Sequence, residues 1–204
     1  MTHNDNSVNI EAAGRGYHHG DLRSALIAAG LESLREGSLD GLSLRALARE
    51  AGVSATAVYR HFPDKEALLA ALALAGFDRM AAAQQAASRA AAGQGPVAAF
   101  CASGAAYVRF AILNPELFRL MWKSAPDGDQ LSQPIDQVHP AMADLRHAVE
   151  EMARPGASEE DKRATALRCW GLVHGLASLT LDRQIELDDE TIDRVIGGLA
   201  AAMR

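Results

Sequence analysis

At 204 residues the chain is longer than a typical single domain, so it accommodates either one compact body or two unequal ones. Hydrophobic residues make up 49% and charged residues 23%, which are the proportions of a folded protein rather than of a disordered one. The formal net charge of −6 argues against a protein that coats nucleic acid nonspecifically, because such binding needs a positive surface.

The negative charge is unevenly distributed along the chain. Residues 1–65 carry 7 Lys and Arg against 8 Asp and Glu, whereas residues 66–204 carry 13 against 18. The first third is therefore nearly neutral, and a local DNA-binding surface there remains compatible with the acidic total.

The sequence gives no support for a disulfide-stabilised, a secreted or a membrane-spanning protein. The two cysteines, Cys101 and Cys169, lie in apolar helical contexts and are expected to be reduced core residues rather than a disulfide framework. The first nineteen residues lack the apolar segment of a signal peptide, and no stretch approaches eighteen uninterrupted apolar residues. We expect a soluble cytoplasmic protein with no membrane partner, no cofactor and no metal.

The composition favours helix throughout. Alanine, the best helix former, dominates the apolar residues, while valine, isoleucine and aromatic residues are sparse. We therefore predict an all-α fold. Residues 1–16 show no apolar period and are predicted to form a disordered arm, followed by a three-helix head over residues 17–65 and a helical body over residues 66–204.

In the head, apolar residues at helical spacing predict a helix over about Asp21–Glu36. Ser43 can cap a short helix, and a second short helix is expected from about Ser54 to His61, which Pro63 prevents from continuing. Asp64 can then cap a long helix that ends at the glycine-rich break 93–95 and connects the head to the body.

The body is predicted to contain four main helices, with one further helix start between the first two. The first runs from about Val97 to Ile112, and Asn114 followed by Pro115 suits the start of the next. Another helix is expected to carry six apolar residues, namely Ile135, Val138, Met142, Leu145, Val149 and Met152. Ser158 and Asp161 resemble a capping box for a helix over about Glu159–Arg183, and the last helix aligns Ile192, Val195, Ile196, Leu199 and Met203.

The segment Ser43–Phe62 has the spacing of a helix-turn-helix. Ala48 is small enough for two helices to approach, Gly52 can take the positive φ of a tight turn, and Val53 with Val58 fills the wedge between the helices. A helical hairpin without DNA-binding function would need similar residues, and that alternative stays open on this segment alone.

Short polar residues at the start of the second short helix suit close approach to base edges, while basic and hydroxyl side chains around it suit phosphates. The candidate DNA-binding residues are Ser43, Arg45, Ser54, Ala55, Thr56, Ala57, Tyr59, Arg60, His61 and Lys65. For Arg45 and Arg60 the alternative is a solvated surface role, and for Arg49 that role is preferred.

The stretch from Gly16 to about Phe77 resembles the DNA-binding domain of the TetR/AcrR family of regulators. The most specific matches are the Gly52-Val53-Ser54 turn, Tyr59 to Phe62, and Asp64 to Leu68. The resemblance implies one recognition helix per operator half-site, a dimer on a palindrome, and phosphate contacts from Tyr59 and Lys65. It also aligns Tyr17 and His18 with an arm near the DNA backbone, although an arm without DNA contact is an equal alternative.

Farther on, Asn114 to Phe118 and Trp170 to Gly175 resemble the C-terminal domain of the subgroup of that family named for a Trp-His-Gly signature. In this family the C-terminal domain usually binds an inducer. The candidate ligand-binding residues are Phe77, Phe100, Tyr107, Phe110, Phe118, Met121, Trp122, Trp170 and His174. Core packing is the commoner role for each of them taken singly, and a buried imidazole bonded to a backbone carbonyl explains His174 equally well.

The resemblance also implies a homodimer built from the last two helices, with Gly171 and Gly175 either at that interface or in close packing within one subunit. The resulting hypothesis is a repressor that binds a palindromic operator and is released by a small apolar effector. An activator with the same head is an alternative. An enzyme using Cys101, Cys169 or a metal held by His139, His147 and His174 lacks any supporting motif.

Overall fold

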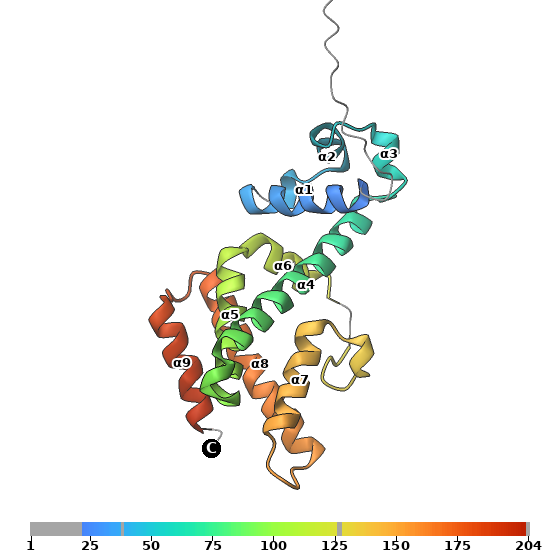
Figure 1. Ribbon diagram of the computed structural model, residues 1–204. Helices are drawn as coiled ribbons and strands as arrows, with labels where there is room; N and C mark the ends of the chain where they lie inside the picture. Colours follow the sequence, from blue (N-terminus) through green and yellow to red (C-terminus); the bar gives the residue numbers. More distant parts are fainter. Residues whose placement is uncertain (1–21, 38, 126–127, 203–204) are drawn as a thin grey trace, which may run out of the picture.

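The computed structural model describes residues 22–37, 39–125 and 128–202, and within these ranges all regular secondary structure is helical. This confirms the all-α prediction. A small head of three helices lies at one end of the long helix α4, and the remaining helices surround the other end (Figure 1). The predicted arm 1–16 and the candidate contacts Tyr17 and His18 lie outside the described residues.

The head consists of α1 (Leu22–Glu36), α2 (Leu44–Glu50) and α3 (Ala55–Tyr59). Its core is formed by Leu26, Leu47, Val58 and Phe62, each at most 1% exposed. Helix α3 ends two residues earlier than predicted. After its last turn the chain folds the Phe62 side chain inward, and the amides of residues 61 and 62 both donate to the Val58 carbonyl.

Side-chain caps and one glycine set the helix-turn-helix geometry. The Ser43 hydroxyl accepts from the Ala46 amide at 3.1 Å, and the Ser54 hydroxyl accepts from the Ala57 amide at 3.2 Å. Between the two helices Gly52 has a φ of +66°, which is strained for any residue with a side chain. These observations confirm the predicted Ser43 cap and the predicted turn, and the Ser54 cap adds to them.

Helix α4 (Lys65–Ala91) is the longest element, at 27 residues, which corresponds to roughly 40 Å at 1.5 Å per residue. The Asp64 carboxylate caps it by accepting from the Ala67 amide at 2.7 Å. It ends in a 3₁₀ turn over Ala92–Gln94, followed by Gly95 with a φ of +102°, as the glycine-rich break predicted. Along its length α4 contacts α1, α5, α6 and α7.

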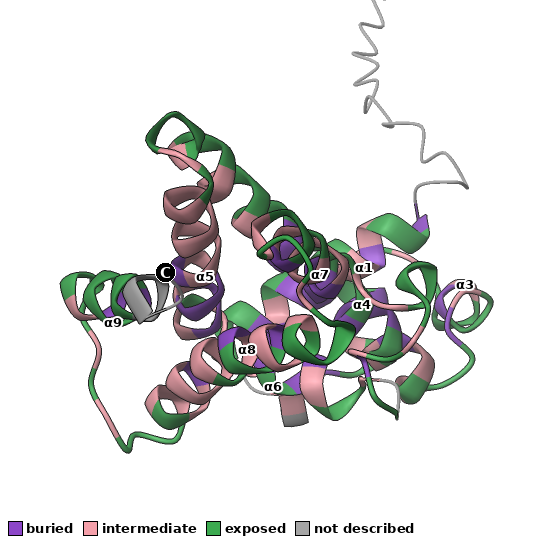
Figure 2. Ribbon diagram, turned by 90° about the horizontal axis from the view of Figure 1, so that it is seen from below, coloured by how far each residue is buried: buried purple, intermediate pink, exposed green. Residues whose placement is uncertain are grey.

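The body contains α5 (Pro96–Leu113), α6 (Pro115–Lys123), α7 (Pro140–Met152), α8 (Glu159–Leu181) and α9 (Asp189–Ala202). Helix α5 is central, with α4, α8 and α9 packed against it. Buried residues gather along α1, α4 and the middle of this body, whereas α8 and α9 keep largely exposed or half-exposed outer faces (Figure 2).

Among the described residues α5 is also the one helix that is long and apolar enough to cross a bilayer, with a mean hydropathy of 1.5. In the single chain 28% of this helix is buried. Its Arg109 forms ion pairs with Asp189 at 2.5 Å and Asp193 at 2.9 Å, both on α9. Helix α5 is thus attached to the neighbouring helices of the body.

The predicted helix start at Asn114 and Pro115 is confirmed, since α6 begins at Pro115. The Asn114 side chain does not cap α6; its amide donates to the Phe110 carbonyl at 2.9 Å and so closes the end of α5. The predicted start of α7 is wrong. Ile135 and Val138 lie before α7 instead of within it, because Pro140 disfavours helical backbone in the preceding residue and suits a first helical position. The predicted capping box of Ser158 and Asp161 is present at the start of α8.

The contact between α4 and α6 depends on a residue without a side chain. A Cβ atom at Gly76 would lie 2.7 Å from Met121 Cγ and Sδ and 2.9 Å from Leu117 Cδ1, and Met121 is fully buried. Replacing Gly76 with Ala is expected to lower the free energy of unfolding by about 1 to 3 kcal/mol through overpacking, despite the higher helix propensity of alanine.

Denaturant unfolding followed by circular dichroism measures this change, and Gly104→Ala on α5 is the matched control. A Cβ there meets its nearest neighbour, Val173, at an ordinary 3.4 Å, so alanine should be neutral or stabilising. Equal destabilisation by both substitutions would show that the α4–α6 contact is not specially close-packed.

Candidate DNA interface and effector cavity

The recognition helix α3 presents a short exposed face. Ala55, Thr56, Tyr59 and Arg60 are exposed, with Tyr59 at 43%, whereas Ala57 is partly buried against the head. Because α3 begins at Ala55, Thr56 lies in its first turn, the part of a recognition helix that comes nearest to base edges. Ser54 is exposed as well, although its hydroxyl is occupied as the cap.

A shallow hollow lies beside this face, where the starts of α2 and α4 approach the end of α3. It has a volume of about 390 Å³ and is lined by Ser43, Leu44, Arg45, Tyr59, Pro63, Asp64 and Lys65. Exposed cationic and hydroxyl side chains next to the amino end of a long helix suit an anionic group such as a DNA phosphate.

Two of the predicted phosphate contacts differ in how freely they can move. The Arg45 side chain is exposed and, among the described residues, forms no ion pair. Lys65 is partly buried, and its ammonium group donates to the Leu39 carbonyl at 3.4 Å, which holds it against the loop before α2. His61 is also partly buried, and Arg49 is exposed on α2.

The body contains a cavity of about 360 Å³ between α4, α5, α7 and α8. Three of the nine predicted ligand residues line it, namely Phe100, Tyr107 and Trp170. Its apolar wall is completed by residues such as Met142, Leu145 and Val173. Its volume of about 360 Å³ is at the low end of the size range of small-molecule sites.

The other six predicted residues do not line the cavity. Phe110 and Met121 are buried core residues. Phe77, Phe118, Trp122 and His174 form an aromatic cluster with Tyr107, His139 and Trp170, in which Trp122 is the central ring at 5.4 Å from Phe77, 4.8 Å from His174 and 5.7 Å from Trp170. Trp170, Tyr107 and His139 belong to both the cluster and the cavity wall.

His174 has a different partner from either of its predicted ones. Its Nδ1 atom lies 2.9 Å from the Tyr107 hydroxyl, so the imidazole is satisfied by a side chain of α5 rather than by a backbone carbonyl. Burial lowers the pKa of His174 and raises that of Tyr107, which keeps both groups neutral near pH 7.

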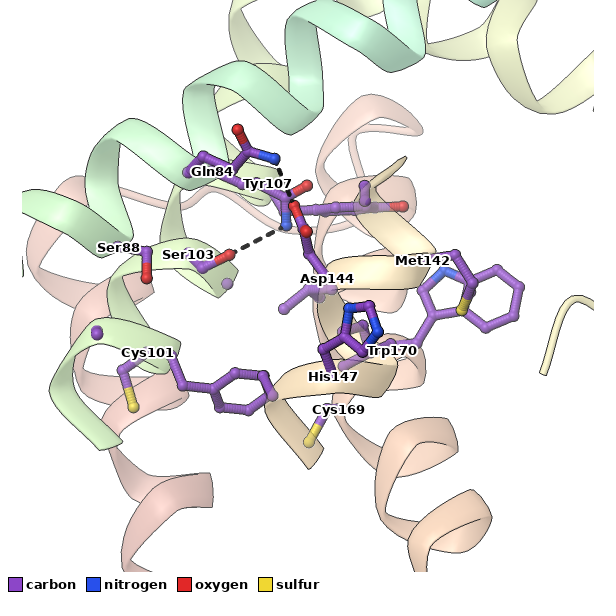
Figure 3. Close-up of a pocket in the computed structure, with 18 of the residues that line it drawn as sticks. Gln84, Ser88, Cys101, Ser103, Tyr107, Met142, Asp144, His147, Cys169 and Trp170 are labelled. Atoms are coloured by element: carbon purple, nitrogen blue, oxygen red, sulfur yellow. Dashed lines mark hydrogen bonds between the residues drawn. The ribbon is translucent and has the colours of Figure 1, made fainter. Parts of the chain in front are cut away.

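Sequence reasoning missed the polar side of the cavity. Gln84 Nε2 donates to Ser103 Oγ at 3.4 Å and Gln85 Nε2 donates to Asp144 Oδ2 at 2.8 Å, as the dashed lines in Figure 3 mark. Further polar residues in the wall are Ser88, Arg89, Cys101, His139, His147, Glu151 and Cys169. On amphipathic helices these positions are indistinguishable in sequence from ordinary solvent-facing ones.

Cys169, one of the two cysteines of the wall, shows no sign of catalytic activation. Burial raises the pKa of the Cys169 thiol to about 11, so it is not ionised near neutral pH. No group of three or more His, Cys, Asp or Glu side chains in the described ranges is arranged to hold a metal ion.

Two family models match the chain. The model of bacterial regulatory proteins of the tetR family matches residues 26–72, and the model of the tetracyclin repressor-like C-terminal domain matches residues 100–203. The chain belongs to the tetR family. It is thus a DNA-binding transcriptional regulator, as its resemblance predicted, and regulators of this family are not enzymes. The C-terminal match does not bear on the Trp-His-Gly subgroup.

Solved structures share the fold. A protein of unknown function from Rhodococcus sp. RHA1 is 36% identical, with a TM-score of 0.73 over 93% of this chain and 96% of that one. A TetR transcriptional regulator from the same organism has a TM-score of 0.56 at 19% identity, over 91% of this chain and 97% of that one. A possible TetR family transcriptional regulator from Streptomyces coelicolor A3(2) has a TM-score of 0.54 at 24% identity, over 75% and 68%. No curated protein matches the sequence.

The buried imidazole of His139 predicts a specific pH dependence of stability. Burial lowers its pKa from 6.5 to about 4, so as the pH falls the unfolded chain binds the proton first. Stability should therefore be lost between about pH 6.5 and pH 4, by on the order of 3 kcal/mol for this group. Urea unfolding at a series of pH values measures the loss.

His139→Asn is the matched variant, because asparagine also caps helices but does not titrate. It should unfold with a smaller pH dependence over that range than the wild-type protein. Parallel curves for the two proteins would contradict the assignment of the pH effect to His139.

Proposed function

We propose that this regulator is a homodimeric repressor that binds a palindromic operator through its two heads and is released when a small, largely apolar effector enters the cavity of the body. It acts in the cytoplasm, where its DNA is. The head covers residues 17–65 and the effector-binding and dimerising body residues 66–204, so that the boundary falls in the first turn of α4.

The observation that carries this proposal is the continuity of α4. Its first turn provides Lys65 to the hollow beside the recognition helix, and its last turns provide Gln84, Gln85, Ser88 and Arg89 to the cavity wall. One unbroken helix thus contacts both sites, and a displacement of its cavity end changes the position of the head.

A second physical connection runs through the aromatic cluster. Tyr107 and Trp170 contact the cavity on one side and Phe118 and Trp122 of α6 on the other. Helix α6 in turn packs closely against Gly76 of α4 and also contacts α1 in the head. A ligand that moves these rings therefore acts on the head through α4 and also through α6.

Tight binding alone would not release DNA. An effector shifts the equilibrium only if it binds the DNA-incompetent arrangement more tightly than the DNA-bound one. We propose that the two arrangements differ in the separation of the heads, because a dimer must present its recognition helices about one DNA turn, roughly 34 Å, apart.

The outer faces of α8 and α9 supply the proposed dimer interface. Leu167 and Leu179 on α8 and Val195 on α9 are exposed in the single chain, at 54%, 45% and 36%. Gly171 and Gly175 on α8 have open space around their Cα atoms, which suits the close approach of a second copy. Pairing these helices around a two-fold axis would bury the exposed apolar side chains.

Within the proposed DNA interface, base reading and phosphate binding are assigned to different residues. Thr56 and the small side chain of Ala55 face the bases, with Ala57 packed behind them, whereas Tyr59, Arg60, Arg45 and Lys65 hold phosphates. Ser43, Ser54 and His61 support this surface. The exposed first turn of α3 and the hollow beside it support the division.

Selection of binding sites from random DNA tests the proposal. We expect the wild-type protein to select an inverted repeat, and a mobility-shift titration to give two protomers per site. Thr56→Ala should select a different base at one position of each half-site, and Tyr59→Phe should weaken binding to all sites by roughly 3- to 10-fold with the selected sequence unchanged.

The matched control is Glu50→Gln, an exposed residue of α2 outside the proposed contacts, which should change neither affinity nor sequence. A selected site without two-fold symmetry would contradict the palindrome. An unchanged selected sequence for Thr56→Ala would contradict the role given to that side chain.

A further inference from the structure

Three buried polar side-chain atoms at or beside the cavity have no partner within hydrogen-bond distance among the described residues. They are Gln84 Oε1 on α4, Trp122 Nε1 on α6 and His139 Nε2 just before α7. Burial raises the pKa of the Tyr107 hydroxyl and the Trp122 indole interacts with that group so as to lower it, but Trp122 Nε1 does not come within hydrogen-bond distance of the hydroxyl. The Trp122 and His139 rings lie 5.9 Å apart, and Phe77 contacts both. Because native proteins rarely leave such atoms unpaired, this arrangement points to a polar group that enters from outside the chain.

Two of the three atoms are hydrogen-bond donors. The indole Nε1 of Trp122 can only donate. His139 Nδ1 accepts from the Met142 amide at 3.2 Å, so the neutral ring carries its proton on Nε2. Burial lowers the pKa of His139 to about 4 and keeps the ring neutral. If the Gln84 amide is turned by 180°, its oxygen accepts from the Ser103 hydroxyl and its nitrogen becomes a free donor, so Gln84 does not require a donor from the ligand.

The donors face no full positive charge. The charged residues of the cavity wall are Arg89, Asp144 and Glu151, and both Arg89 and Glu151 are exposed, at the open side of the cavity. A buried carboxylate would therefore lack a counter-charge at the inner end, and its desolvation would oppose binding. An uncharged acceptor meets both donors without that cost.

We propose that the effector is an uncharged carbonyl compound with an apolar body, whose carbonyl oxygen accepts from Trp122 Nε1 and His139 Nε2 while the body lies along Phe100 and Met142. This inference rests on the proposed function, since it assigns a ligand class to the proposed effector cavity.

The position of Trp122 links recognition to response. Trp122 does not line the cavity itself but lies behind Trp170 and Tyr107, at 5.7 Å from the Trp170 ring. Trp122 also contacts His139, which lines the cavity, and it belongs to α6, which packs on α4. A compound that carries an acceptor at its end and binds Nε1 would therefore act on α6, and one without the acceptor would not.

Three naphthalenes of nearly the same shape test the ligand class: 2-acetylnaphthalene, 2-isopropylnaphthalene and the anion 2-naphthoate. Calorimetric titration of the wild-type protein should give a Kd for the ketone about tenfold lower than for the hydrocarbon, which corresponds to two net hydrogen bonds of modest strength. The hydrocarbon is the more apolar of the two, so burial alone would favour it. The carboxylate should bind most weakly.

Substitutions assign the preference to the two donors. Trp122→Phe removes the indole donor and should reduce the ketone-to-hydrocarbon ratio of affinities to about threefold or less. His139→Ser, which keeps a helix cap, should do the same, so either variant suffices if the other fails to fold. Trp170→Phe is the matched control: it should weaken both compounds and leave the ratio unchanged.

Equal affinities for ketone and hydrocarbon in the wild-type protein, tightest binding of the carboxylate, or a ratio unaffected by both donor variants would overturn the carbonyl assignment. If the hydrocarbon weakens operator binding as strongly as the ketone, the proposed function stands and this inference fails. If the ketone is preferred but leaves operator affinity unchanged, the ligand class stands and release by effector fails. Absence of binding by all three would count against the cavity as the effector site and so against both.

Discussion

The behaviour of this protein depends on one long helix that stays unbroken between its two functional ends. Helix α4 is capped at Asp64, next to the hollow by the recognition helix, and does not end before Ala91, beyond the cavity. A helix interior containing glycine is normally less stable than one containing alanine. Here Gly76 is required because Met121 of α6 occupies the space that a Cβ atom would need. The same contact that joins the body to α4 therefore constrains its sequence.

The aromatic cluster complements this constraint. Its rings come from α4, α5, α6 and α8 and from the residue before α7, so a movement of one ring is transmitted to several helices through close packing. The Tyr107 hydroxyl and His174 Nδ1 pair with each other, whereas the Trp122 indole and His139 Nε2 have no partner within hydrogen-bond distance. Trp122 thus has two roles: it is the residue through which α6 joins the aromatic cluster, and its indole nitrogen is an unpaired donor.

The head and the helix order could be predicted from sequence because their signals are local. Ser43, Ser54 and Asp64 are residue types whose side chains cap helices, so they indicate helix starts directly. Gly52 indicates a backbone conformation that other residues avoid. The cavity could not be predicted in the same way. Phe100 and Phe118 have equally apolar surroundings in the sequence, yet only Phe100 lines the cavity, because the crossing of four helices decides which ring faces the space.

The polar residues of the cavity could not be predicted from the sequence either. Gln84 and His139 look like ordinary surface or loop residues until α4, α6 and α7 bring them together. The start of α7 differs from the prediction for a related reason, because Pro140 sets the first residue of that helix and leaves Ile135 and Val138 before it. Local propensity indicates where a helix can start and which residues can line a site, and tertiary contacts decide which of these possibilities occur.

The distance between the two heads of the dimer tests most directly whether the cavity controls DNA binding. Nitroxides attached to a non-natural residue at the exposed position Glu50 would report it by pulsed electron resonance in the operator complex and in a variant whose cavity is filled by Ala148→Trp. The account predicts that the filled variant keeps its helix content, binds the operator more weakly and holds its heads at a separation different from that in the operator complex. The same separation and an unchanged operator affinity in the filled variant would contradict it.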